Sequence, residues 1–137
     1  YLCRDGRCIN ENIAIPRFLK PFLEAVGHTD WLNHLTDNGR LRSEGTLLEE
    51  WTQKFEELWL EKTALEWENL MEELGVPGTV CRTVDEWLNE PHASESGAVI
   101  QINDPTFGMM KQPGLLVKTH GNIGQVKAPA PKMPGVD

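Results

Sequence analysis

The sequence has few of the features that mark several common classes of protein. Only three of its 137 residues are cysteine, too few for a disulfide scaffold, and no apolar run approaches the ~20 residues of a membrane-spanning helix. Its first residues do not resemble a signal peptide, so we expect a cytoplasmic protein without a membrane partner. The formal net charge of −8 argues against nucleic acid as a partner, because a non-specific binder needs a basic face.

Motifs that carry chemistry are equally scarce. The three cysteines and four histidines show neither CxxC nor HxxxH spacing, which argues against a zinc site. The glycines of 121–124 lack the lysine of a phosphate-binding loop and do not lie between a strand and a helix. We therefore expect no catalytic residue, no metal site and no covalently bound cofactor in this chain.

What is present suits one folded domain. Hydrophobic residues make up 39% of the chain, and five tryptophans and four phenylalanines provide large side chains for a core. The predicted fold class is α+β, with an N-terminal β-hairpin, central helices and C-terminal strands. We expect residues 1–120 to form this domain and the proline-rich residues 121–137 to form an extended C-terminal arm.

Two short strands are predicted around Asp5-Gly6, a dipeptide that favours a two-residue type I′ turn. This turn places Cys3 opposite Cys8, at a separation where a cross-strand disulfide is geometrically feasible. Because no secretory signal is seen, we expect reduced thiols. We also expect Cys81 to be buried in a strand.

Helical spacing and capping signals predict the middle of the chain. A first helix follows Pro16 and ends at Gly27, a short helix and a loop occupy 28–45, and a longer helix covers 46–62. Thr63 and Thr83, each three residues before a glutamate, predict two capping boxes and two further helices. Strands are predicted over 98–103 and 115–119, separated by a turn at 104–105.

Several apolar side chains are assigned to the core from helical spacing. The stripe of the longer helix consists of Leu47, Leu48, Trp51, Phe55, Leu58 and Trp59. The next helix is expected to bury Leu65, Leu70, Met71 and Leu74. Trp87 is also assigned to the core. Trp67 falls between the apolar stripes, so its assignment to the core has the least support from helical spacing. The many glutamates of 49–73 lie mainly off these stripes, so we expect a solvated acidic face.

Histidines offer a weaker functional pattern. His28, Thr29 and Asp30 are compatible with a His–Asp pair, although a helix cap made by Thr29 or Asp30 is the preferred interpretation. A hydrolase that uses His28 or His92 is a further hypothesis. It requires a nucleophile close in space, and the sequence identifies none.

In their order along the chain, several short motifs resemble the second half of a CoA-transferase of family III, which includes formyl-CoA transferase, carnitine CoA-transferase and α-methylacyl-CoA racemase. No motif is diagnostic by itself, and the resemblance depends on their common order. The motifs are Tyr1-x-x-x-Asp5-Gly6, the helix from Phe18 to Gly27, Arg40 and Arg42, Glu66-Trp67, Gly75-Val76-Pro77-Gly78-Thr79-Val80, Glu86, Pro91-His92, Gly97-Ala98-Val99, Gln112-Pro113-Gly114 and Ala128-Pro129-Ala130-Pro131.

The resemblance implies a chemistry whose central residue is not in this chain. In the family, an aspartate attacks an acyl-CoA thioester to form a mixed anhydride, which CoA thiolate converts to an aspartyl-CoA thioester. That aspartate and the CoA-binding half lie upstream of the stretch that this sequence resembles. CoA or acyl-CoA is then a substrate only where the missing large domain is present. The start at Tyr1 is expected to be a division within a longer enzyme or its ancestor.

The resemblance also implies a role for this part of the chain. We expect a small domain that helps to close the acyl-CoA cleft and to form a homodimer, and that is inactive alone. The alternative is a non-catalytic module that binds a partner protein or acyl-CoA. The candidate cleft loop is Val76, Pro77, Gly78, Thr79 and Val80, although a plain helix-to-strand turn explains it equally well. Two departures from the family are Thr79, where a proline is expected, and 132–136, which replaces a Gly-Glu-His-Thr motif.

Overall fold

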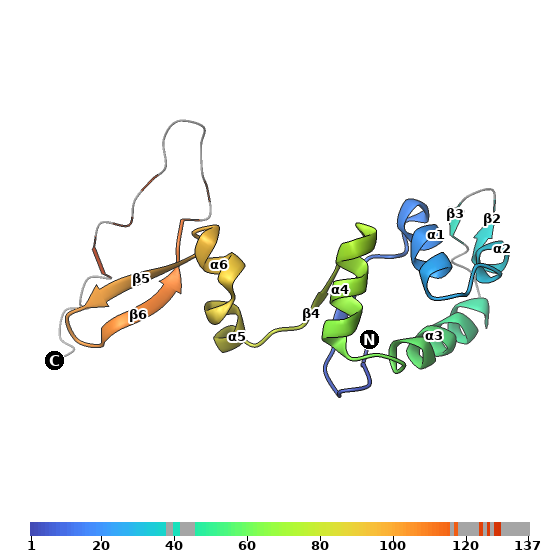
Figure 1. The fold of residues 1–137 in the computed structure, drawn as a ribbon, viewed down its shortest axis with the longest axis horizontal. Helices are drawn as coiled ribbons and strands as arrows, with labels where there is room; N and C mark the ends of the chain where they lie inside the picture. The colour runs from blue at the N-terminus through green and yellow to red at the C-terminus, as the bar shows by residue number, and fades with distance from the viewer. Residues whose placement is uncertain are drawn as a thin grey trace. The chain divides into compact units, whose positions relative to one another are not determined.

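The computed structural model describes residues 1–37, 40–41, 46–115, 117, 124, 126 and 128–129 (Figure 1). The chain divides into two compact units, Tyr1–Cys81 and Arg82–Asp137, and each is described by itself. Both contain helices and strands, which confirms the α+β class. The arm expected over 121–137 lies mostly outside the described residues, so its boundary stays a prediction.

The first and last strands of the first unit pair with each other. Strand β1 (Ile9–Glu11) pairs antiparallel with β4 (Gly78–Val80), so that Ile9 lies opposite Val80. A second antiparallel pair, β2 (Thr36–Asp37) with β3 (Arg40–Leu41), was not expected from the sequence. The helices between these strands are α1 (Pro16–Ala25), α2 (Trp31–Leu35), α3 (Thr46–Trp59) and α4 (Ala64–Leu74).

Aromatic side chains form the centre of this unit. Trp59 lies with its ring 5.3 Å from Phe22 of α1 and 4.8 Å from Trp67 of α4, centroid to centroid. All three are fully buried, which confirms the core assignment of Trp59 and settles the position of Trp67. The indole Nε1 of Trp67 donates a hydrogen bond of 2.9 Å to the Trp59 carbonyl oxygen, so its polar group is satisfied.

Helix α4 begins where the sequence predicted. The Thr63 hydroxyl accepts from the Glu66 N–H, and the Glu66 carboxylate accepts from the Thr63 N–H. Gly75 ends the helix in the left-handed region, with φ of 64°. One predicted core residue was wrong: Leu65 is 55% exposed, because α4 turns Ala64, Trp67 and Met71 toward the core instead.

The N-terminal hairpin differs from the prediction by one position. Leu2 pairs with Cys8, and Cys3 N–H donates to the Arg7 carbonyl, so the loop has three residues rather than two. Gly6, with φ of 76°, supplies the left-handed residue that this longer loop needs. Cys3 therefore does not lie opposite Cys8. Cys3 is buried and Cys8 exposed, and both are free thiols.

The second unit consists of two short helices and a hairpin, namely α5 (Val84–Asn89), α6 (Pro91–Glu95), β5 (Val99–Asp104) and β6 (Gly108–Pro113). The Thr83–Glu86 capping box before α5 is confirmed. The strand predicted over 115–119 was wrong: Leu115 and Val117 lie in no strand, and the rest is outside the described residues. The chain turns back directly after Asp104, whose carboxylate accepts from the N–H groups of 106 and 107.

Candidate functional site

The candidate cleft loop, Val76–Val80, is tied into the scaffold of the first unit. The Val76 N–H donates to the Met71 carbonyl, which closes the C-terminal end of α4. The Glu68 carboxylate accepts from both the Thr79 hydroxyl (2.8 Å) and the Val80 N–H (2.9 Å). The candidate loop is thus a short turn at Val76 and Pro77 followed by strand β4, and not a loop throughout.

Packing restricts the same segment further. A Cβ placed on Gly78 would lie 2.2 Å from the Met71 sulfur, so a larger residue at this position would require the buried Met71 side chain to move. Val76 and Val80 are buried, and Pro77 and Thr79 are exposed. Of the five predicted cleft residues, these two are therefore the ones presented to a ligand or partner. Their contact with a ligand stays a prediction.

A small pocket of about 150 Å³ lies beside the loop before α2 and one face of α3. Its lining consists of His28, Trp31, Lys54, Glu57, Leu58 and Glu61. The His28 and Trp31 rings stack with centroids 4.1 Å apart. Asp30 occupies the N-cap position of α2 as predicted, but its side chain makes no capping hydrogen bond.

This pocket does not support a hydrolase. No serine, threonine or cysteine is among the lining residues given by the described part of the chain, so His28 has no nucleophile to activate there. His92 lies in α6 of the second unit, and no hydrogen bond joins its imidazole to a described serine, threonine or cysteine. The described geometry therefore gives no support to a hydrolase.

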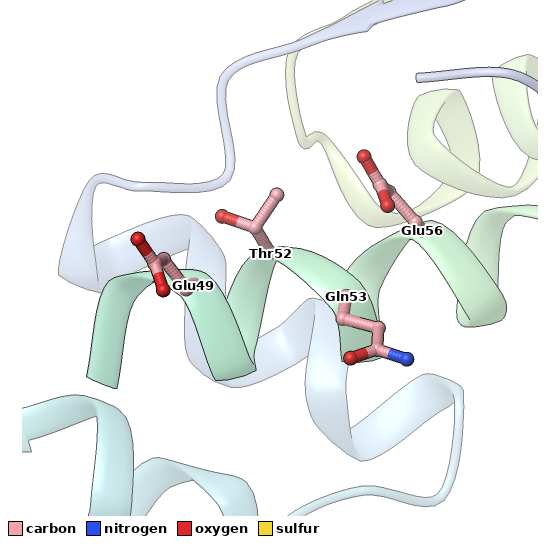
Figure 2. A pocket seen from close by; sticks show the side chains of 4 residues that line it. All are labelled: Glu49, Thr52, Gln53 and Glu56. Atoms are coloured by element: carbon pink, nitrogen blue, oxygen red, sulfur yellow. The ribbon is translucent and has the colours of Figure 1, made fainter. Parts of the chain in front are cut away.

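Helix α3 carries an open, polar hollow on its solvent side (Figure 2). Glu49, Thr52, Gln53 and Glu56 line it, and all four side chains project from this one helix. Their spacing of three and four residues places them on a single helical face, opposite the buried Trp51 and Phe55. The exposed glutamates confirm the solvated acidic face predicted from the sequence.

The shifted pKa values of Glu66, Cys3 and Tyr1 each have a structural cause. Hydrogen bonds from Thr63 lower the pKa of the Glu66 carboxyl, with the Arg4 guanidinium 2.8 Å away as a smaller cause. Burial raises the pKa of the Cys3 thiol, and the nearby Asp5 carboxylate adds to the effect. Burial, followed by the charges of Glu11 and Glu56, raises the pKa of the Tyr1 phenol.

These shifts follow from helix capping and core packing, and they do not create an acid–base pair. Within the described ranges, no three histidine, cysteine or acidic side chains are placed to bind a metal ion. No helix in the same part of the chain is both long and apolar enough to cross a bilayer.

The second unit presents apolar side chains that the sequence analysis assigned elsewhere or overlooked. Trp87, expected in the core, is 44% exposed, because α5 buries none of its residues. Phe107 and Met109 of the β5–β6 hairpin are 78% and 66% exposed. Ala93 and Val99 are the fully buried apolar residues among those described in this unit. The large apolar side chains described in this unit are thus mainly on its surface.

The fold is similar to one part of a larger protein of known structure. In an orthorhombic crystal form of Rv3272 from Mycobacterium tuberculosis, the matching region gives a TM-score of 0.64 at 18% sequence identity. The match covers 81% of this chain but only 31% of the Rv3272 chain. A mutant of Rv3272 gives the same score, with 30% of its chain covered.

The family is shown by the sequence as a whole: residues 1–137 match CoA-transferase family III, and the chain belongs to this family. It is also 32% identical over 81 residues to "CoA-transferase/lyase DddD" of Marinomonas sp. (strain MWYL1), a stretch that is 59% of this chain and 10% of that protein. The chain thus spans about a third of the solved structures and a tenth of the curated relative. The family resemblance inferred from motif order is confirmed.

Proposed function

We propose that this chain is the small-domain part of a family III acyl-CoA transferase, where it helps to close the acyl-CoA cleft and to form a homodimer. The observation that carries the proposal is the family match over residues 1–137 on a fold that accounts for less than a third of a solved relative. The nucleophilic aspartate implied by the family belongs to a segment outside this chain, and acyl-CoA is a substrate of the assembled enzyme. Its location is the cytoplasm expected from the sequence.

Exposed apolar side chains support a covering role. Trp87, Phe107 and Met109 are exposed apolar side chains. Burial of their apolar surface against a neighbouring domain would stabilise the assembly by about 25 cal/mol per Å². Burial of such a surface over a reactive acyl anhydride keeps water away from it and so limits hydrolysis. In this proposal the chain supplies a wall and an interface, while the bond-making groups come from the large domain.

The direct test is an assay of thioester exchange with the purified 137-residue chain, an acyl-CoA and an acceptor carboxylic acid. No exchange is expected, because the proposal assigns the nucleophilic aspartate to a segment outside this chain. Measurable turnover by this chain alone would overturn the proposal.

A second measurement tests the covering surface itself. An environment-sensitive apolar dye should bind the chain, and the double substitution W87E/F107E should lower that binding at least about threefold. The matched control is L65E, which changes an equally exposed apolar residue of the first unit. Equal losses for both variants would show that the apolar surface of the second unit has no special role.

A further inference from the structure

Two exposed cysteines lie opposite each other at the end of the β1–β4 pair. The register places Ile9 opposite Val80, and the next position along the two strands places Cys8 opposite Cys81. The Cys81 N–H donates a hydrogen bond of 2.8 Å to the Cys8 carbonyl oxygen, so the antiparallel ladder continues through this position. Cys81 is thus not buried within a strand, as the sequence predicted, but exposed just beyond one.

Both thiols face the same side of this ladder. Side chains alternate along a strand, and the neighbouring Ile9 and Val80 are buried against the core. Cys8 and Cys81 therefore point away from the core, and both are exposed and free. Cys3, in contrast, is 1% exposed and lies inside the core cluster.

The separation of the two backbones suits a disulfide. Directly opposed, hydrogen-bonded residues of antiparallel strands have Cα atoms about 5.5 Å apart. Disulfides span Cα separations of about 4.4–6.8 Å and need Cβ atoms about 3.5–4.5 Å apart, so a small approach of the two strand ends closes the bond. The thiol pair that the backbone supports is consequently Cys8 with Cys81, and not Cys8 with Cys3.

We propose that Cys8 and Cys81 form a dithiol modification site, which a small-molecule disulfide oxidises to an intramolecular disulfide. One cysteine thiolate attacks the small disulfide, whose S–S bond breaks and releases one small thiol. The second cysteine thiolate then attacks the mixed disulfide at the protein sulfur and releases the second small thiol. Two cysteine thiols are oxidised, one small disulfide is reduced, and the two thiol protons end on the released thiols.

The site has a structural consequence. Cys81 is the last residue of the first unit, and the bond would tie it covalently to the first strand of that unit. A bond that closes so long a stretch of chain restricts the unfolded state and stabilises the folded one. Because the bond would be exposed, small thiols could reduce it again, which is typical of regulatory rather than structural disulfides.

Mass spectrometry of the full chain, treated with oxidised glutathione under native conditions, tests the proposal. We expect the loss of two hydrogens and a linked peptide pair that contains Cys8 and Cys81, with Cys3 unmodified. Stable glutathione adducts on Cys8 and Cys81 without a link, a link that includes Cys3, or a link between two chains would each overturn it.

Variants and an equilibrium measurement sharpen the test. C8S and C81S should each abolish the link and retain one glutathione adduct, whereas the matched control C3A should keep the link. The equilibrium constant for closure against glutathione should be at least about tenfold higher in the native chain than in the urea-unfolded chain. Equal constants would show that the fold does not bring the thiols together, and this result needs no variant to fold.

Discussion

The two units of the chain differ in how they are stabilised. The core cluster lies entirely within the first unit, where it includes Phe22, Trp59 and Trp67. In the described part of the second unit, Ala93 and Val99 are the fully buried apolar residues, and larger apolar side chains remain in contact with water. The described residues of the first unit thus enclose an apolar core, whereas those of the second unit leave most of their large apolar side chains exposed.

The N-terminal caps of α4 and α5, in contrast, are the same in the two units. Both units contain a capping box with the same residues and the same hydrogen bonds, Thr63–Glu66 in the first and Thr83–Glu86 in the second. Helix α4 buries three residues behind its cap, while α5 buries none. A capping signal thus sets where a helix begins, and tertiary packing decides how much that helix contributes to global stability.

The largest expected contrast is between two tryptophans. Trp67→Ala removes a fully buried indole and its bond to the Trp59 carbonyl, and should lower the free energy of unfolding by about 3–5 kcal/mol. Trp87→Ala should change it by no more than about 0.5 kcal/mol, because the residue is 44% exposed. Urea unfolding followed by circular dichroism measures both. Similar losses for the two variants would contradict the proposed difference between the units.

A smaller contrast concerns the two capping boxes. Thr63→Ala should lower the global free energy of unfolding by about 1 kcal/mol, because α4 packs into the core. Thr83→Ala should speed amide hydrogen exchange within α5 but leave the main unfolding transition unchanged. Thermal unfolding and exchange of the same two proteins give both readouts. A shift of the main transition by Thr83→Ala, equal to that by Thr63→Ala, would mean that α5 belongs to the same cooperative unit.

Short-range signals in the sequence predicted much of the fold. The capping boxes, the end of α1 near Gly27 and the α3 residues Trp51, Phe55, Leu58 and Trp59 were all correct, because spacing within one element determines them. Trp67 was left open because its burial depends on contacts with α1 and α3. Trp87 was placed wrongly because periodicity shows which face is apolar, but not whether anything covers it.

Register and function were harder to predict for related reasons. A difference of one residue in the N-terminal loop places Cys8 opposite Leu2 rather than Cys3, and the other edge of the same strand places Cys8 opposite Cys81. No local sequence pattern predicts the pairing of Cys8 with Cys81. The end of α4 at Gly75 was predicted correctly, but Gly78–Val80, predicted as part of a loop, form strand β4. Contact of this segment with acyl-CoA stays a prediction.

The smallest expected effect concerns pH. Hydrogen bonds from Thr63 lower the pKa of Glu66 in the folded state, so its ionised form favours folding. This contribution is complete above the unfolded pKa of about 4.3 and is lost as the pH falls through the lower folded value. Glu66→Gln should therefore lower the urea midpoint at pH 7, and the difference from wild type should shrink steadily as the medium is acidified below pH ~4.3.

Glu73→Gln, an exposed change of the same charge on the same helix, is the matched control. Because Glu66 is exposed and its bond to Arg4 is screened by salt, the effect should also decrease when ionic strength rises. If Glu66→Gln and Glu73→Gln gave the same difference at every pH, the cap would contribute no more than general charge. A difference confined to Glu66→Gln would show that the carboxylate bound by Arg4 and Thr63 contributes to folding beyond its general charge.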